Sequence, residues 1–176
     1  MLTATYSIVA LELEHKKARW TFSSLQQYVL TSIRHLKTAG GIDIDQLFQR
    51  LSQFEQYCRQ RRVATFLIPT LRKITREADA LLDELEQLSA AGMALMSSLQ
   101  ARLAQAFSQG ALAVEELCQS LEACCVNFCQ RLSREEELVR IAERVMPSEA
   151  WFGFAASALS QQSKKLSAKQ LVDDEV

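Results

Sequence analysis

The side chains best suited to chemistry are one histidine and two charged residues that interrupt apolar helical patterns. His15 lies in a series of apolar residues spaced by three and four over residues 11–29, and Arg131 and Glu135 lie in a similar series over residues 114–145. Burial of these series would bury the three polar groups, which would then need partners. Inward-facing imidazole and carboxylate groups in a helical bundle can hold a metal. A hydrogen-bonded histidine and an Arg–Glu pair one helical turn apart are the simpler alternative.

The cysteines are the other candidates for chemistry. There are five, an odd number: Cys58, Cys118, Cys124, Cys125 and Cys129. All but Cys58 fall within one stretch of helical spacing. We expect free thiols that pack as small apolar residues, because the CxxC pairs with further Cys or His ligands that are typical of zinc sites are missing. A thiol-based sensor that uses Cys124, Cys125 and Cys129 is the alternative.

The composition argues against several classes of function. With only two histidines, no Ser-His-Asp or Cys-His set can be assigned, and His35 lies near an expected helix end, so we expect no enzyme. The net charge is −1 and the pI is near 6.2, without the basic excess of a nucleic-acid binder. No apolar run approaches the roughly 18 residues of a membrane span, and the N-terminal stretch lacks a basic leader. These features predict a cytoplasmic protein that binds neither nucleic acid nor membrane.

Four long segments of helical spacing must position these residues. Breaks are expected at "TAGG" (38–41), at Pro69, at "SQG" (108–110) and at "MPSEAW" (146–151). The second segment can be capped by Asp43 or Asp45, and the third begins near Thr75. A short fifth helix would follow, with three aromatic residues that either close the end of the bundle or form an exposed patch: Trp151, Phe152 and Phe154.

Four helices of similar length joined by short connections predict an all-α fold, an up-down-up-down antiparallel four-helix bundle with a short extra C-terminal helix. We expect one domain over residues 1–165 and a flexible acidic tail over residues 166–176.

Four stretches resemble the bacterial hemerythrin-like (HHE cation-binding) domain family over roughly residues 8–155. They are "LELEHKKARWTF", "FEQYCRQRRVATFLIPTL", "ALLDELEQLSAAGMALMSSL" and "FCQRLSREEELVRIAERVMPSEAW". The resemblance implies a hemerythrin-like bundle with a di-iron centre that binds oxygen.

The metal ligands of the family are mostly replaced in this chain. His15 matches a family ligand and Glu135 or Glu136 matches the acid of the fourth helix, but arginine, glutamine, valine, alanine and serine occupy the other matched positions: Arg59, Gln60, Val63, Ala64, Ser89 and Arg131. Because arginine stays protonated and repels a dication, we expect no cofactor and no metal site. If a metal does bind, His15 and Glu135 are the residues to hold it.

These observations predict a hemerythrin-like bundle that has lost di-iron and oxygen binding and acts as a metal-free binding or regulatory module, with a protein partner left open. We expect a buried polar core of His15, Arg131 and Glu135, in which Arg131 pairs with Glu135. A residual metal- or small-ligand-binding protein that senses iron, oxygen or NO is the first alternative, and the thiol sensor is the second. The sequence leaves the oligomeric state open.

Overall fold

The computed structural model describes residues 2–38, 43–106 and 111–156, and in this part of the chain the secondary structure is helical, without strands. The prediction of an all-α chain is confirmed. The elements are α1 (Leu2–Lys37), α2 (Ile44–Gln60), the π-helical η1 (Val63–Leu67), α3 (Ile68–Ile74), α4 (Asp79–Ala106) and α5 (Ala111–Val145). Residues 148–156 form a further short helix, and the predicted tail over residues 166–176 lies outside the described residues.

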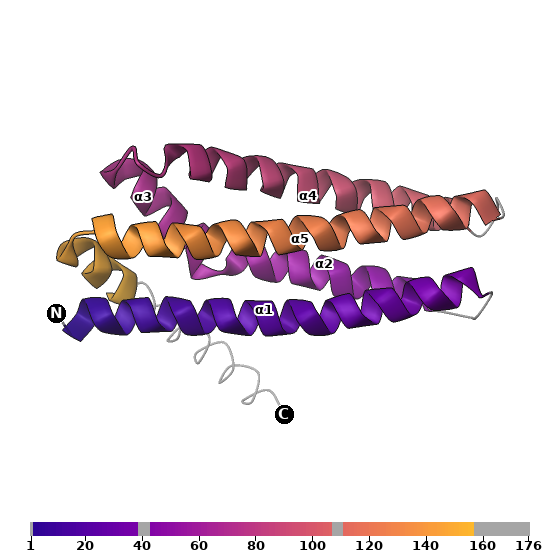
Figure 1. Ribbon diagram of the computed structural model, residues 1–176, viewed down its shortest axis with the longest axis horizontal. Helices are drawn as coiled ribbons and strands as arrows, with labels where there is room; N and C mark the ends of the chain where they lie inside the picture. The colour runs from indigo at the N-terminus through magenta and orange to yellow at the C-terminus, as the bar shows by residue number, and fades with distance from the viewer. Residues whose placement is uncertain (1, 39–42, 107–110, 157–176) are drawn as a thin grey trace, which may run out of the picture.

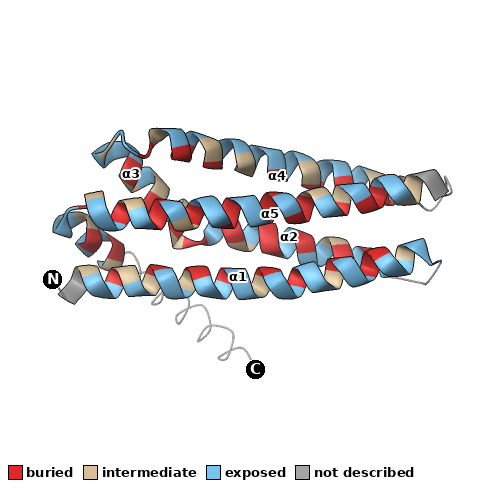
Figure 2. Cartoon of the chain, viewed as in Figure 1, coloured by how far each residue is buried: buried red, intermediate tan, exposed pale blue. Residues whose placement is uncertain are grey.

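The long helices α1, α2, α4 and α5 lie side by side, and each runs opposite to the long helix before it in the chain (Figure 1). Contacts join α1 to α2, α2 to α4, α4 to α5, and α5 back to α1, so each long helix touches two neighbours. Buried residues follow the helix faces that look toward the other helices, and exposed residues follow the outer faces (Figure 2). This bundle-like packing places one face of every long helix around a shared interior.

The helix ends differ in part from those expected. The Asp43 carboxylate accepts a hydrogen bond from the Gln46 N–H at 2.9 Å, so Asp43 is the cap of α2. The break expected at Pro69 comes eight residues earlier, where Arg61 takes an extended conformation (φ −66°, ψ 153°). Pro69 instead stands in the first turn of α3, directly after η1. Thr75 ends α3 and does not begin the next helix, which starts at Asp79.

The apolar core is divided into two clusters along the bundle. On α1, Leu11 belongs to one cluster and Ala18 to the other, and His15 lies between them. On α5, Phe128 belongs to the cluster of Ala18 and Leu138 to the cluster of Leu11. The interior therefore has two apolar halves separated by a layer of polar side chains.

The short C-terminal helix closes one half of this core. Trp151 and Phe154 are buried, and their rings pack against each other with centroids 6.1 Å apart, while Phe152 is exposed. The Ser7 hydroxyl of α1 donates to the Trp151 carbonyl at 3.3 Å. Two of the three aromatic residues thus cover the bundle end, which excludes an exposed patch formed by all three.

Candidate functional site

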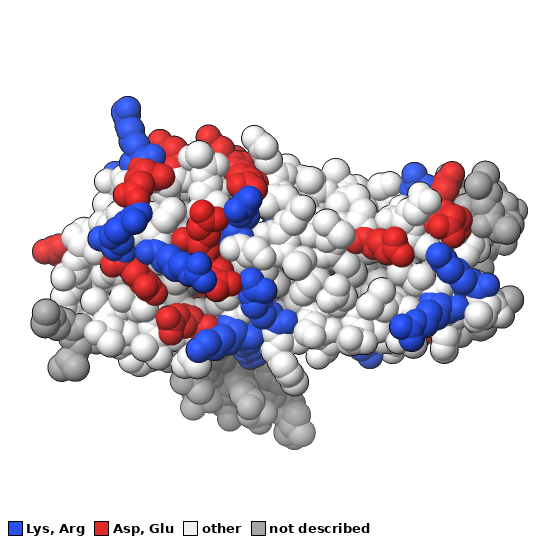
Figure 3. Space-filling model, viewed as in Figure 1, with Lys and Arg blue, Asp and Glu red and all other residues white. Residues whose placement is uncertain are grey.

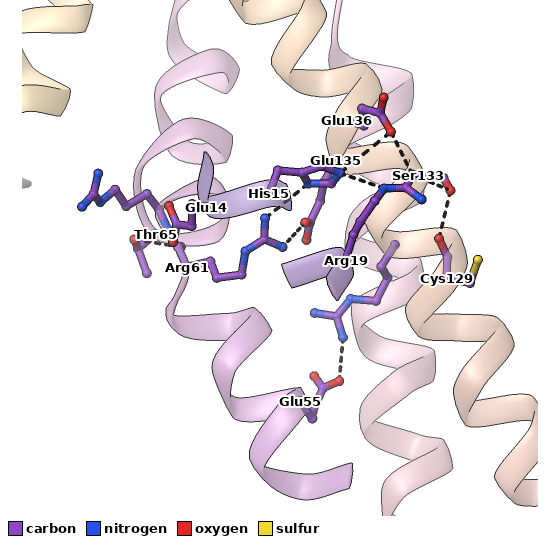
Figure 4. A network of polar contacts seen from close by, with 12 residues as sticks. Glu14, His15, Arg19, Glu55, Arg61, Thr65, Cys129, Ser133, Glu135 and Glu136 are labelled. Carbon is purple, nitrogen blue, oxygen red and sulfur yellow. Dashed lines mark hydrogen bonds and ion pairs between the residues drawn. The ribbon is translucent and has the colours of Figure 1, made fainter. Parts of the chain in front are cut away.

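Five buried polar residues form the layer between the two apolar clusters (Figure 4), and we call them the polar layer. They come from three parts of the chain: His15 of α1, Glu55 and Arg61 of α2 and its C-terminal end, and Arg131 and Glu135 of α5. Each of the five residues is exposed to 6% or less. Full burial of four charged groups requires direct pairing, because each charge has lost its water.

Two arginine–carboxylate pairs provide that pairing. Arg61 Nη1 donates to Glu135 Oε2, and Arg131 Nη1 donates to Glu55 Oε2 at 2.6 Å. Both pairs connect α5 to the C-terminal part of α2 across the interior. The two guanidinium groups and two carboxylates balance in charge, so the layer is neutral if His15 is neutral.

The expected pair between Arg131 and Glu135 does not form. All three predicted residues of the polar core are buried, but each charge on α5 meets a partner from the α2 side and not its neighbour one turn away. The polar core expected from the sequence included neither Glu55 nor Arg61. Signals for both were present: Arg61 stands three residues after the buried Cys58, and Glu55 stands four after the buried Leu51.

The break at the end of α2 turns Arg61 inward. After Arg61 the backbone leaves the α-helix, and its carbonyl accepts hydrogen bonds from the Thr65 N–H at 3.0 Å and the Thr65 hydroxyl at 3.1 Å. The next N–H, of Arg62, donates to a Glu14 carboxylate oxygen of α1 at 3.1 Å. The Arg59 side chain, by contrast, is half exposed. Of the three arginines in "RQRR", only Arg61 therefore enters the core.

Gly92 of α4 leaves room for the polar layer. A Cβ atom at this position would lie 2.7 Å from Asn127 Oδ1, 3.4 Å from Arg131 Nη1 and 3.5 Å from Glu55 Oε2. Asn127 is itself held by a hydrogen bond from its Nδ2 to the Leu88 carbonyl at 2.9 Å. The bare backbone of α4 thus packs directly against the Arg131–Glu55 pair.

His15 lies at the edge of the layer, between a buried and an exposed arginine. Arg61 Nη2 is 3.4 Å from His15 Nδ1, and Arg19 Nε is 3.3 Å from His15 Nε2. A guanidinium only donates, and a neutral imidazole has a single acceptor nitrogen, so only one of these contacts can be a hydrogen bond. Glu136 Oε2, at 3.9 Å from Nε2, favours a proton on Nε2, which leaves Nδ1 to accept from Arg61. Burial first, and then Arg61 and Arg19, lower the pKa of His15 from 6.5 to about 4.

Exposed ion pairs surround the His15 edge. Arg19 Nη2 donates to Glu136 Oε2 at 2.8 Å, and Arg140 Nη2 donates to Glu136 Oε1 at 2.8 Å. The depression over His15 has a volume of about 390 Å³ and is lined by Glu12, His15, Lys16, Arg19, Glu136, Val139, Arg140 and Glu143. Charges of both signs also intermingle on the face of the molecule that carries α4 and α5 (Figure 3). Such exposed pairs contribute little stability, unlike the buried pairs of the polar layer.

The depressed pKa of His15 predicts a loss of stability in mild acid. Between pH 6.5 and 4 the unfolded chain binds a proton at this residue that the folded chain does not, so the free energy of unfolding falls as the pH is lowered. From pH 7 to pH 5 the loss is about 2 kcal/mol. Urea unfolding of wild type and His15→Gln at both values measures it. His15→Gln should lose this part of the pH dependence. His35→Gln, a change at an exposed position, should keep it. Equal pH dependence of the unfolding free energy in wild type and His15→Gln would show that His15 is not its source.

Four of the five thiols are buried in the folded protein. Burial raises the pKa of Cys58 and Cys124 to about 12 and that of Cys125 to about 11, and it also raises the pKa of Cys118. Cys129 is exposed. A raised pKa and a buried sulfur both suppress the thiolate, which is the reactive form.

We expect one fast-reacting thiol in the native chain. Titration with a disulfide reagent should modify Cys129 rapidly and the other four only at the rate of unfolding, and in denaturant all five should react. Cys129→Ser should remove the fast phase. A fast phase of two or more thiols in wild type would show that Cys124 or Cys125 is accessible.

Fold and site together define an all-helical protein with a buried arginine–carboxylate layer. No protein-family model matches the chain, and neither a curated protein nor a solved structure matches it. Within the described residues, no group of three or more His, Cys, Asp or Glu side chains is arranged to hold a metal ion. None of the helices in the described part of the chain has the length and apolar character needed to cross a membrane.

Proposed function

We propose that this chain is a hemerythrin-like up-down-up-down four-helix bundle in which two buried arginine–carboxylate pairs replace a di-iron centre. In this proposal it acts in the cytoplasm as a metal-free binding or regulatory module and has no enzymatic activity. The observation that carries the proposal is the position of Arg61, whose guanidinium contacts both His15 and Glu135. These are the two residues that the family resemblance leaves as candidate ligands.

One guanidinium between the two candidate ligands is incompatible with a metal at the same place. Arg61 has no lone pair to donate, and its positive charge repels a dication. The remaining carboxylate of the layer, Glu55, is bound by Arg131 in the same manner. Each buried carboxylate of the polar layer is therefore already neutralised by an arginine, which is the role a metal ion plays in a di-iron bundle.

The two alternative functions lack comparable support. A residual metal site would need His15 and Glu135 to release Arg61, which would leave its guanidinium buried without a partner. A thiol sensor that uses Cys124, Cys125 and Cys129 needs thiolates, and burial raises the pKa of the first two. The metal-free module remains the function that the geometry supports best.

Metal analysis of the purified protein tests this proposal. Protein produced in medium supplemented with iron, zinc and copper should carry far less than one metal ion per chain, and adding these ions should leave its Tm unchanged. A tightly bound metal would raise the Tm by mass action. Stoichiometric metal that survives desalting, together with a metal-dependent rise in Tm that is lost in His15→Ala, would overturn the proposal.

A further inference from the structure

Helix α1 has a second apolar face, directed to solvent. Five of the nine exposed large apolar side chains of the described residues lie on α1, and four of these align: Tyr6, Val9, Leu13 and Trp20. Their spacing of three, four and seven residues places them on one side of the helix. We call these four residues the α1 stripe. They are 66%, 45%, 60% and 74% exposed, respectively.

The α1 stripe differs from ordinary surface apolar residues by its alignment. Isolated exposed apolar side chains are common and need no explanation. Here four of them follow one line over about 21 Å of helix, at a rise of 1.5 Å per residue. The buried series of α1, which includes Leu11 and Ala18, lies on the opposite side of the helix. Tyr and Trp are also among the residues that contribute most to protein interfaces, so the α1 stripe has the composition of a binding surface.

We propose that the α1 stripe binds a second copy of this chain, with the two α1 helices antiparallel about a two-fold axis at Leu13. The ends of the stripe are equidistant from this residue, because Tyr6 lies seven positions before it and Trp20 seven positions after it. Val9, four positions before Leu13, lies opposite the partner's Lys17, whose aliphatic stem can cover it. Antiparallel pairing places Leu13 against the partner's Leu13 and Tyr6 against the partner's Trp20. The same patch then serves both subunits, as an isologous interface requires.

Charges beside the stripe complement each other in this arrangement. Glu12 and Lys16 are exposed on the same flank of the α1 stripe, and neither forms an ion pair within the described part of the chain. In an antiparallel pair related by a two-fold axis, a given flank of one α1 helix lies next to the same flank of the partner's α1 helix. Glu12 then lies near the partner's Lys16, and Lys16 near the partner's Glu12. Two equivalent ion pairs between subunits follow, and they outweigh the single like-charge approach of Glu12 to the partner's Glu12.

Sedimentation equilibrium of the full chain measures the self-association. Wild type should form dimers, and Leu13→Glu should raise the dissociation constant by at least about 100-fold, because it places two like charges together on the axis. Val126→Glu is the matched control, since Val126 is 56% exposed but lies on α5. The control should dimerise like wild type. Circular dichroism of each variant establishes that it is folded.

Charge reversal and cross-linking test the register and the direction of the helices. Glu12→Lys and Lys16→Glu should each weaken self-association, and an equimolar mixture of the two variants should form heterodimers, because opposite charges meet again. In a Cys129→Ser background, Tyr6→Cys mixed with Trp20→Cys should form an interchain disulfide upon mild oxidation.

Three results would overturn the proposal. The first is a folded wild-type chain that stays monomeric up to about 100 μM, well above the dissociation constants of weak specific dimers. The second is a dimer that Leu13→Glu leaves intact. The third is a monomer whose α1 stripe binds lipid vesicles of mixed neutral and anionic composition, since lipid would then be the occupant.

Discussion

Replacing Arg61 by methionine is expected to lower the free energy of unfolding by about 3–5 kcal/mol, because the change leaves the Glu135 carboxylate buried without its partner. Methionine keeps most of the length of the arginine stem, so the loss reports the missing charge more than a cavity. Burial already raises the pKa of Glu135, and the Arg61 guanidinium opposes that effect. Without Arg61 the carboxyl should take up a proton well above its ordinary pKa.

Urea unfolding of three variants gives the measurement and its controls. Arg59 stands two residues before Arg61 and its side chain is half exposed. Arg59→Met should therefore change the free energy of unfolding by less than about 0.5 kcal/mol. The double variant Arg61→Met/Glu135→Leu replaces the whole pair by apolar groups and should recover most of the loss. If Arg61→Met unfolds within about 1 kcal/mol of wild type, Arg61 is not the partner on which Glu135 depends.

The same substitution has a second readout at His15. Burial lowers the pKa of His15 most, and Arg61 is the charged residue that lowers it most. Removal of Arg61 should therefore raise the pKa of His15 from about 4 toward 6.5. An NMR titration of the two histidines follows this shift. Simple loss of packing would lower stability without moving the pKa of His15 in this direction, so the two readouts together separate electrostatic pairing from volume.

Replacing Arg131 by methionine is the second change expected to have a large effect, again about 3–5 kcal/mol of unfolding free energy. Glu55 Oε2 accepts the hydrogen bond from Arg131, and Glu55 Oε1 has no hydrogen-bond partner among the described residues. The substitution would therefore leave both carboxylate oxygens of Glu55 without a hydrogen bond. Arg59, at 3.8 Å from Oε1, is half exposed and can compensate only in part.

Arg134→Met is the matched control on the same helix. Arg134 forms two exposed ion pairs, with Glu84 and Glu137, and water screens both, so Arg134→Met should lose far less stability than Arg131→Met. Arg131→Met/Glu55→Leu should be closer to wild type than Arg131→Met alone. Equal losses in Arg131→Met and Arg134→Met would contradict a special role for the buried pair.

Comparison of the two pairs tests whether the polar layer acts as a unit. Arg131 also lowers the pKa of Glu135, so the pairs interact electrostatically although they share no hydrogen bond. The double variant Arg61→Met/Arg131→Met should then deviate from additivity by about 0.5–3 kcal/mol, whereas independent sites add within about 0.5 kcal/mol. The sign of the deviation shows whether, after one arginine is replaced, the other partly neutralises the carboxylate that has lost its partner.

Helical periodicity was enough to predict which residues enter the long helices and which helix faces turn inward. Apolar residues at spacings of three and four are a property of one helix, and they require no knowledge of its neighbours. On this basis His15, Arg131 and Glu135 were expected inside, and the structure buries all three. The cap at Asp43 was one of two expected positions for the same reason, since capping depends on local geometry.

The pairing of the buried charges follows from how the helices pack against one another. Arg131 and Glu135 are one turn apart on α5, but their partners, Glu55 and Arg61, are more than 70 residues away in the chain. Pairing of this kind depends on the relative height and rotation of facing helices, and helical periodicity does not contain this information. The inward turn of Arg61 further depends on a backbone break at the end of α2, and the approach of Arg131 to α4 depends on the missing side chain of Gly92. The periodicity thus predicted a polar interior, and the packing of the helices determined that two arginine–carboxylate pairs neutralise it.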